Sequence, residues 1–169
     1  MRRDRRRRWR SHDADNAQHD HDEGAPHGTN TTPGPQASSL AGVRLILVRH
    51  AKAAPGEPDA LRPLTPEGLE VAQSLGAELG GLRPDAVVSR PLLRARQTAT
   101  PIAETAGVEL DVEPRLSPGA TLSDFRAVAE GRGELVVIVG HQPDLSNAVH
   151  ALTGTDIPFR PGAFSEVEL

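Results

Sequence analysis

The stretch LVVIVGHQPDLS, residues 135–146, decides the fold that this sequence can adopt. Its first five residues are all apolar and mostly β-branched, a pattern typical of a strand buried on both faces of a sheet. Gly140 and His141 follow at once, and a helix is expected from Asp144 to about Leu152. A buried strand, a polar corner and a helix in succession predict an α/β sheet with His141 at the carboxyl end of its strand.

The same arrangement occurs at two earlier places in the chain. The run RLILV (44–48) precedes Arg49 and His50, and DAVVS (85–89) precedes Arg90 and a helix that Pro91 opens. Further elements are expected as helices over 66–79, over 91–106 and from a Ser123 cap to about 130, and as strands over 108–112 and 163–169. This alternation predicts a three-layer αβα sandwich around a mostly parallel sheet.

The composition of the whole chain excludes several classes of protein. With 169 residues it is expected to form one domain at most, and without cysteine it can have no disulfide scaffold, thiolate zinc site or cysteine nucleophile. No apolar run approaches the ~20 residues that span a bilayer, and no signal-peptide core follows the first residues. We therefore expect a cytoplasmic protein, and the net charge of −4 argues against a polycation that binds nucleic acid as a whole.

Residues 1–42 differ from the rest and are expected to form a disordered arm ahead of a folded domain over 43–169. The arm opens with seven arginines among its first ten residues and continues as an acidic, histidine-rich segment. Its arginines could contact RNA, DNA or an acidic membrane, but a solvated tail is favoured. Four arm histidines (His12, His19, His21, His27) are not expected to hold a metal, because nothing fixes their geometry. No cofactor is expected, and no oligomeric state is predicted.

Polar side chains follow three of the predicted strands, at the edge of the sheet where ligands of such folds bind. His50 and His141 end two strands, Arg49 precedes His50, and Arg94 lies about one helical turn beyond the third strand. Guanidinium groups pair bidentately with phosphate oxygens, and an imidazole nitrogen accepts a phosphoryl group near neutral pH. A phosphoryl site is therefore favoured over a sulfate or carboxylate site, which would make poorer use of several cations.

Four motifs, in order, resemble the histidine phosphatase superfamily and, more narrowly, its small SixA-type phosphohistidine phosphatases. They are LILVRHAKA (45–53), LRPLTPEG (61–68), VVSRPLLRARQTA (87–99) and VVIVGHQPDLS (136–146). The resemblance covers about residues 43–169 and implies a phosphoglycerate-mutase-like fold without a lid domain, and a metal-independent phosphatase. It implies that His50 is the nucleophile, that Arg49 and Arg94 bind the phosphoryl oxygens, and that His141 contacts the transferring group. Arg62 of LRPLT either reaches the pocket or faces solvent.

The chain departs from the broad family at two points. Ala51 stands where the family has glycine, a small change that is common among SixA-type members. Larger relatives carry an acidic proton donor. Glu57, Asp59 and Glu67 are the nearest acids in this sequence, which does not choose among them, and each is favoured as a surface carboxylate. Two further cations, Arg90 and Arg96, are expected in surface salt bridges.

The leading hypothesis is hydrolysis of phosphohistidine on a phosphorelay or phosphotransferase protein. The leaving group would be an imidazole, which needs less proton donation than an alkoxide, and an open site suits a protein-borne substrate. One alternative is a small-molecule phosphomonoesterase that uses the same residues. Another is a non-catalytic phosphate-binding module.

Overall fold

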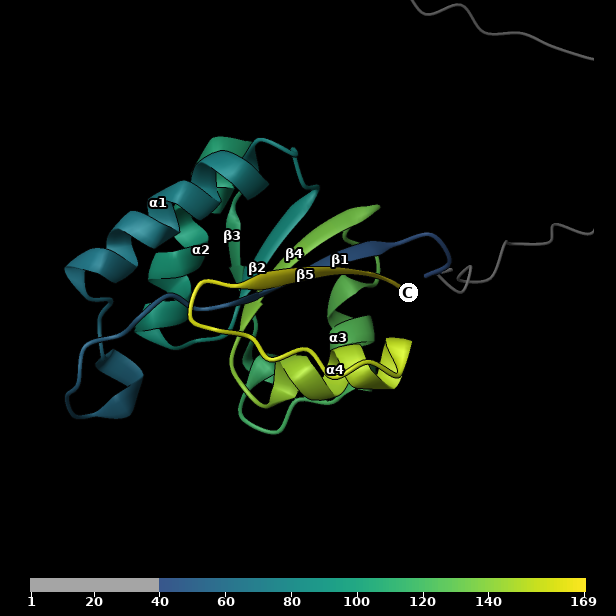
Figure 1. Cartoon of the computed structure of the whole chain (residues 1–169). Coiled ribbons are helices and arrows are strands. Elements are labelled where there is room, and N and C mark those ends of the chain that lie inside the picture. The colour runs from purple at the N-terminus through teal and green to yellow at the C-terminus, as the bar shows by residue number, and fades with distance from the viewer. Residues whose placement is uncertain (1–39) are drawn as a thin grey trace, which may run out of the picture. The chain divides into compact units, whose positions relative to one another are not determined.

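The computed structural model describes residues 40–169 (Figure 1). Residues 1–39, which carry the arginine block and the four arm histidines, lie outside the described part, so the predictions made for them are not tested. None of the helices within 40–169 combines the length and hydropathy that a bilayer span needs.

Five strands form one sheet in the order β3-β2-β4-β1-β5. They are β1 (Arg44–Arg49), β2 (Ala86–Ser89), β3 (Leu110–Val112), β4 (Leu135–Gly140) and β5 (Phe164–Glu168). All neighbours pair in parallel except β5, which runs antiparallel to β1. In this register Val139 lies opposite both Val48 and Ser89, so β1, β2 and β4 end level with one another. The residues that follow these three strands therefore emerge at one edge of the sheet.

Four helices cover the two faces of the sheet (Figure 1). They are α1 (Pro66–Gly80), α2 (Leu93–Ala106), α3 (Leu122–Ala129) and α4 (Asp144–Thr153). Alternate residues of the central strands point to opposite sides. Ile46 and Val137 pack with α1 and α2, whereas Leu47 and Ile138 pack with α3 and α4. The predicted three-layer αβα sandwich is thus confirmed.

The connection between β1 and α1 contains only a short 3-10 turn, η1 (Asp59–Leu61), so no lid domain is inserted there. A second turn of this kind, η2 (Pro114–Leu116), precedes α3. Leu40, which the sequence places in the arm, packs against the core beneath α3 and α4.

Three predicted boundaries shift by two residues or fewer. The first turn of α2 begins at Leu93 rather than at Pro91, because the Leu92 carbonyl is the first acceptor, bonded by Ala95 and Arg96. The cap of α3 is Thr121 rather than Ser123. The Asp124 carboxylate accepts from both the N–H and the hydroxyl of Thr121, each at 2.7 Å. Strand β3 is confined to 110–112.

Helices α1 and α2 approach each other closely, and this contact fixes the helix that carries Arg94. A Cβ atom on Gly76 would lie 2.7 Å from the Cβ of Pro101, and one on Gly80 would lie 2.6 Å from the Cβ of Thr105. Only glycine fits at these positions without displacing α2.

Candidate active site

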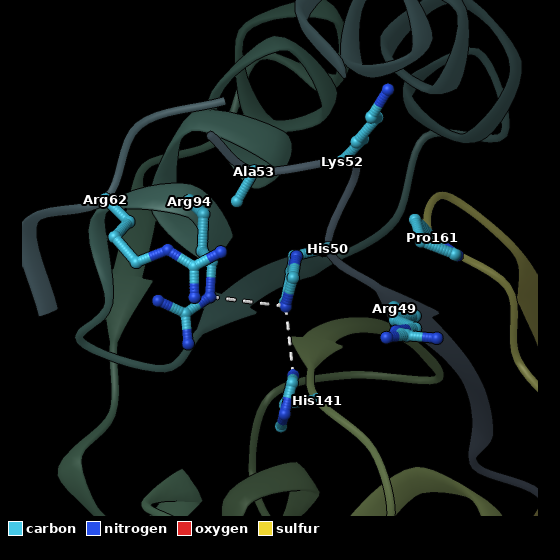
Figure 2. Close-up of a pocket in the computed structure, with 8 residues that line it drawn as sticks. All are labelled: Arg49, His50, Lys52, Ala53, Arg62, Arg94, His141 and Pro161. Atoms are coloured by element: carbon cyan, nitrogen blue, oxygen red, sulfur yellow. Dashed lines mark hydrogen bonds between the residues drawn. The ribbon is translucent and has the colours of Figure 1, made fainter. Parts of the chain in front are cut away.

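The residues that follow the strands meet in a pocket of about 290 Å³ at the carboxyl edge of the sheet (Figure 2). Its lining consists of Arg49, His50, Lys52, Ala53, Arg62, Arg94, His141 and Pro161. All five residues singled out from the sequence are among them, and Arg62 faces the pocket rather than solvent alone. Sequence reasoning missed Lys52, although it lies in the RHAKA motif two residues beyond His50.

His50 presents a nitrogen lone pair to this pocket. Its Nδ1 lies 2.8 Å from the carbonyl oxygen of Ala51, which can only accept, so the ring proton resides on Nδ1 and Nε2 is bare in the neutral imidazole. The N–H of Ala51, a fully buried residue, donates to Thr98 Oγ1 at 3.0 Å and anchors this corner to α2. The tautomer of His50 is therefore set by a backbone group that cannot rotate away.

Two donors converge on the Nε2 atom of His50. Figure 2 shows His50 between Arg94, whose Nε donates to it at 3.3 Å, and His141, whose Nδ1 lies 2.9 Å from it. The two imidazole planes differ by 2° and their centroids are 5.1 Å apart. With their nitrogens in contact, the rings meet edge to edge and not face to face. Both donors thus surround the point at which an electrophile would bind His50.

Both histidines are held in the neutral form. Burial above all keeps the pKa of His50 at about 4, below its ordinary value of 6.5, and the charges of His141, Arg94 and Arg49 act in the same direction. The hydrogen bond to the Ala51 carbonyl opposes them. The pKa of His141 is also lowered, first by burial and then by the charge of Arg90. At neutral pH the Nε2 atom of His50 is consequently available as a nucleophile.

Arg94 is a buried guanidinium, 5% exposed, at the start of α2. Its two terminal nitrogens donate to Asp59, one to the backbone carbonyl at 2.8 Å and the other to Oδ2 at 3.0 Å. Arg62 donates to the other carboxylate oxygen of Asp59 at 3.0 Å and to the carbonyl of Ala54 at 2.8 Å. These hydrogen bonds to Arg94 and Arg62 hold the pKa of Asp59 below its usual range.

Asp59 is a surface carboxylate, as expected, but its two ion pairs were not predicted from the sequence. Its side chain is 56% exposed, but it joins two cations of the pocket wall. Glu57 and Glu67 are exposed and lie outside the pocket lining, as expected of surface carboxylates.

Arg49 is held by backbone carbonyls of the segment that leads into β5. Its side chain donates to Phe159 O at 2.7 Å, and its backbone N–H donates to Ala163 O at 2.9 Å. Gly162 in turn donates to the carbonyls of Arg49 and His50. The Nε atom of Arg49 is buried without a partner in the described chain, which leaves this guanidinium short of acceptors beside the pocket.

The expected surface salt bridge of Arg90 is wrong, because Arg90 is 1% exposed. It follows the buried strand β2, and its backbone N–H donates to Val139 O. Its Nε has no partner in the described residues, and burial lowers its pKa. Arg96 is exposed as expected, but it makes no ion pair with any residue of the 40–169 region.

The donors around the pocket suit a tetrahedral oxyanion. Guanidinium groups, neutral imidazole N–H groups and Lys52 all donate to oxygen, and the arginines carry positive charge. Within residues 40–169 no three His, Cys, Asp or Glu side chains gather in a way that could hold a metal ion.

Comparisons with known proteins agree with this geometry. The sequence profile of the histidine phosphatase superfamily (branch 1) matches residues 45–117. An uncharacterized protein of Picosynechococcus sp. is 37% identical over 105 residues, which is 56% of this chain. The present chain spans 61% of that relative's length.

Solved structures extend the likeness over most of the described chain. The candidate phosphohistidine phosphatase SixA of Agrobacterium tumefaciens has a TM-score of 0.64 and 26% identity, over 75% of this chain and 91% of its own. A protein histidine phosphatase SixA complexed with tungstate has a TM-score of 0.66 and 25% identity, over 75% and 88%. A mycobacterial glucosyl-3-phosphoglycerate phosphatase, at 19% identity and a TM-score of 0.54 over 67% and 80%, shares the fold alone. The family model, the phosphoglycerate-mutase-like sandwich and these structural likenesses support the histidine phosphatase superfamily, SixA type, as the family that this chain resembles.

Proposed function

We propose that this protein hydrolyses phosphohistidine on a partner protein, by way of a covalent phosphohistidine on its own His50. The observation that carries the proposal is the unprotonated Nε2 atom of His50, which faces a pocket lined by cations. A neutral imidazole nitrogen with its other nitrogen tied to a carbonyl is a nucleophile in the correct tautomer.

Binding of the phosphoryl group would use the donors that now converge on His50. Arg94 Nε and His141 Nδ1 lie within hydrogen-bond distance of His50 Nε2, so the oxygens of a phosphorus atom approaching that nitrogen come within reach of both. Arg49 supplies a further cation. Donors placed around the attacked phosphorus stabilise the charge of its equatorial oxygens in the transition state.

The reaction proceeds in two displacements. In the first, the lone pair of His50 Nε2 forms a bond to phosphorus while the substrate P–N bond breaks. The leaving imidazole nitrogen takes that electron pair and a proton from solvent water, which the second step returns. In the second, water attacks the phosphorus and loses a proton, the bond to His50 breaks, and Nε2 regains its lone pair as inorganic phosphate departs. Neither step requires an oxidant or reductant.

Two features favour a protein-borne phosphohistidine over a small phosphomonoester. No lid domain covers the pocket in the described chain, so a side chain presented on a folded surface can reach it. The SixA relatives are named for phosphohistidine or protein histidine phosphatase activity, and one of them binds the tetrahedral oxyanion tungstate. The proposal places the reaction in the cytoplasm, as expected from the sequence.

The test compares kcat/KM for a phosphohistidine-bearing phosphocarrier protein with kcat/KM for a panel of sugar and glycerate phosphates. We expect the phosphohistidine protein to be the better substrate by at least ~10²-fold, the discrimination that a matched leaving group and binding surface can supply. Higher kcat/KM for a phosphomonoester would assign the protein to small-molecule phosphatases. Acid-labile phosphate on any residue other than His50 would exclude the proposed intermediate.

A further inference from the structure

One carboxylate, that of Asp59, holds two cationic side chains of the pocket wall. Its Oδ2 accepts from Arg94 at 3.0 Å and its Oδ1 accepts from Arg62 at 3.0 Å. The backbone carbonyl of the same residue accepts from Arg94 at 2.8 Å. Asp59 lies in turn η1, between β1 and α1, and reaches across to the first turn of α2. Figure 2 shows the Arg62 and Arg94 guanidinium groups next to each other beside His50.

These hydrogen bonds use the two terminal nitrogens of the Arg94 guanidinium and leave its Nε–H to face His50. Both terminal nitrogens are engaged by Asp59, whereas Nε donates to His50 Nε2. The guanidinium is planar and rigid, so holding its two terminal nitrogens also fixes the direction of the Nε–H bond. Asp59 therefore determines which edge of Arg94 faces the attacking nitrogen.

A carboxylate at this place has two opposing effects on an incoming phosphoryl group. It repels the anion, but its side chain is 56% exposed, so solvent screens that repulsion. It also partners Arg94, whose side chain is only 6% exposed, and no other described residue accepts from the terminal nitrogens of Arg94. A buried guanidinium that loses its acceptors must find a new orientation, which is the larger disturbance.

We propose that Asp59 is a positioning residue for phosphoryl transfer, which orients Arg94, with Arg62 beside it, so that the Nε–H edge of Arg94 faces His50. The inference rests on the proposed function only in that a phosphoryl group is attacked at His50. The inference predicts that loss of the Asp59 carboxylate weakens binding of the transition state, even though this loss removes a negative charge from a site that binds an anion. A carboxylate that merely competes with substrate for the two arginines would have the opposite effect.

The test measures vanadate affinity and the turnover of phosphoramidate, a small donor with a P–N bond, for Asp59→Ala, Asp59→Glu and a matched control. The control is Glu57→Ala, which removes an exposed carboxylate from the same loop that forms no ion pair with residues 40–169. For Asp59→Ala we expect a loss on the order of 10-fold in kcat, with a smaller change in KM, and weaker binding of vanadate. Asp59→Glu should recover part of the loss, and Glu57→Ala should match the wild type.

A double-mutant comparison shows whether Asp59 acts through Arg94. In an Arg94→Ala background, Asp59→Ala should cause no further loss of vanadate affinity, since the group that it orients is already gone. Unchanged or tighter vanadate binding by Asp59→Ala would overturn the proposal, as would full additivity of the two changes. If no variant, wild type included, turned over a P–N donor, the proposed function would fail, and the vanadate measurements would still decide the role of Asp59.

Discussion

The two histidines of the pocket stand on strand ends, whereas two of its arginines are held across the pocket by a loop residue. His50 and His141 follow β1 and β4, whose ends are aligned by the register of the sheet, and His50 is tied to the neighbouring backbone carbonyl. Arg94 and Arg62 are joined by Asp59, which lies in an exposed turn. The position of His50, the proposed nucleophile, thus depends on the core of the fold, and the orientation of the two arginines depends on side-chain contacts that a single substitution can remove.

Replacing His50 by alanine should have the largest effect, because it removes the proposed nucleophile itself. We expect turnover of a phosphohistidine protein to fall by ~10³-fold or more, with the fold retained. Samples quenched at alkaline pH, where a P–N bond survives, should show the phosphoenzyme by mass spectrometry for the wild type and not for the variant, while circular dichroism stays unchanged. Wild-type turnover by this variant would rule out the covalent mechanism.

Arg94→Ala should be the next largest, since Arg94 is the cation that donates directly to the attacking nitrogen. A loss on the order of 10²-fold in kcat/KM is expected, together with weaker vanadate binding measured by inhibition. Arg96→Ala is the matched control, because Arg96 lies on the same helix but is exposed and has no ion pair in the described chain. Equal vanadate affinity of Arg94→Ala and wild type would remove Arg94 from the site.

The pKa of His50 can be measured, and this measurement tests whether burial in the core keeps the imidazole neutral. Its pKa of about 4 lies below the ordinary 6.5, so nitrogen NMR of labelled protein should show a neutral ring protonated at Nδ1 down to about pH 5. A ring that is half protonated near pH 6.5 would contradict the effect of burial.

The same shift affects stability. Between pH 6.5 and about 4 the unfolded chain binds a proton at His50 more readily than the folded one does, so the contribution is present above pH 6.5 and is lost as the pH falls toward 4. The free energy of unfolding, measured with denaturant across this pH window, should therefore fall less steeply with decreasing pH for His50→Ala than for the wild type. An equal slope for both proteins would contradict the shift.

Arg62→Ala should have the smallest effect on kcat/KM of these substitutions. It tests whether Arg62, which Asp59 holds, contributes only to substrate binding. Arg62 is 31% exposed and bonds to Asp59 and Ala54, so its removal should raise KM by about 2- to 5-fold with little change in kcat. Arg44→Gln, an exposed arginine at the opposite end of β1, is the control and should leave KM unchanged. A larger loss in kcat than in KM would give Arg62 a place beside Arg94 in the transition state.

The strand-end part of this site could be predicted from the sequence, and the loop part could not. Buried apolar runs locate strands, and parallel strands deliver their following residues to one edge, so His50 and His141 were expected to meet. The pairing of Asp59 with Arg94 joins residues 35 positions apart through a turn that no hydrophobic pattern specifies. A local signal did exist, because Asp59 precedes Arg62 by three residues, the spacing of an ion pair within one turn.

Arg90 shows a second limit of the sequence pattern. A charged residue after a strand is usually solvated, and nothing local in the sequence indicates that this one is buried. The residue follows β2, which lies next to β4 in the sheet, and its charge is the largest influence after burial that lowers the pKa of His141. Tertiary neighbours therefore decided the surroundings of this residue.

The return of the chain past Arg49 has a consequence for how the protein becomes active during its synthesis. The carbonyl of Phe159 that fixes Arg49 lies 110 residues downstream, and the glycine that bonds the carbonyls of Arg49 and His50 follows three residues later. A ribosome releases these residues long after the nucleophile has emerged. The contacts that hold Arg49 can therefore form only after this last segment has left the exit tunnel.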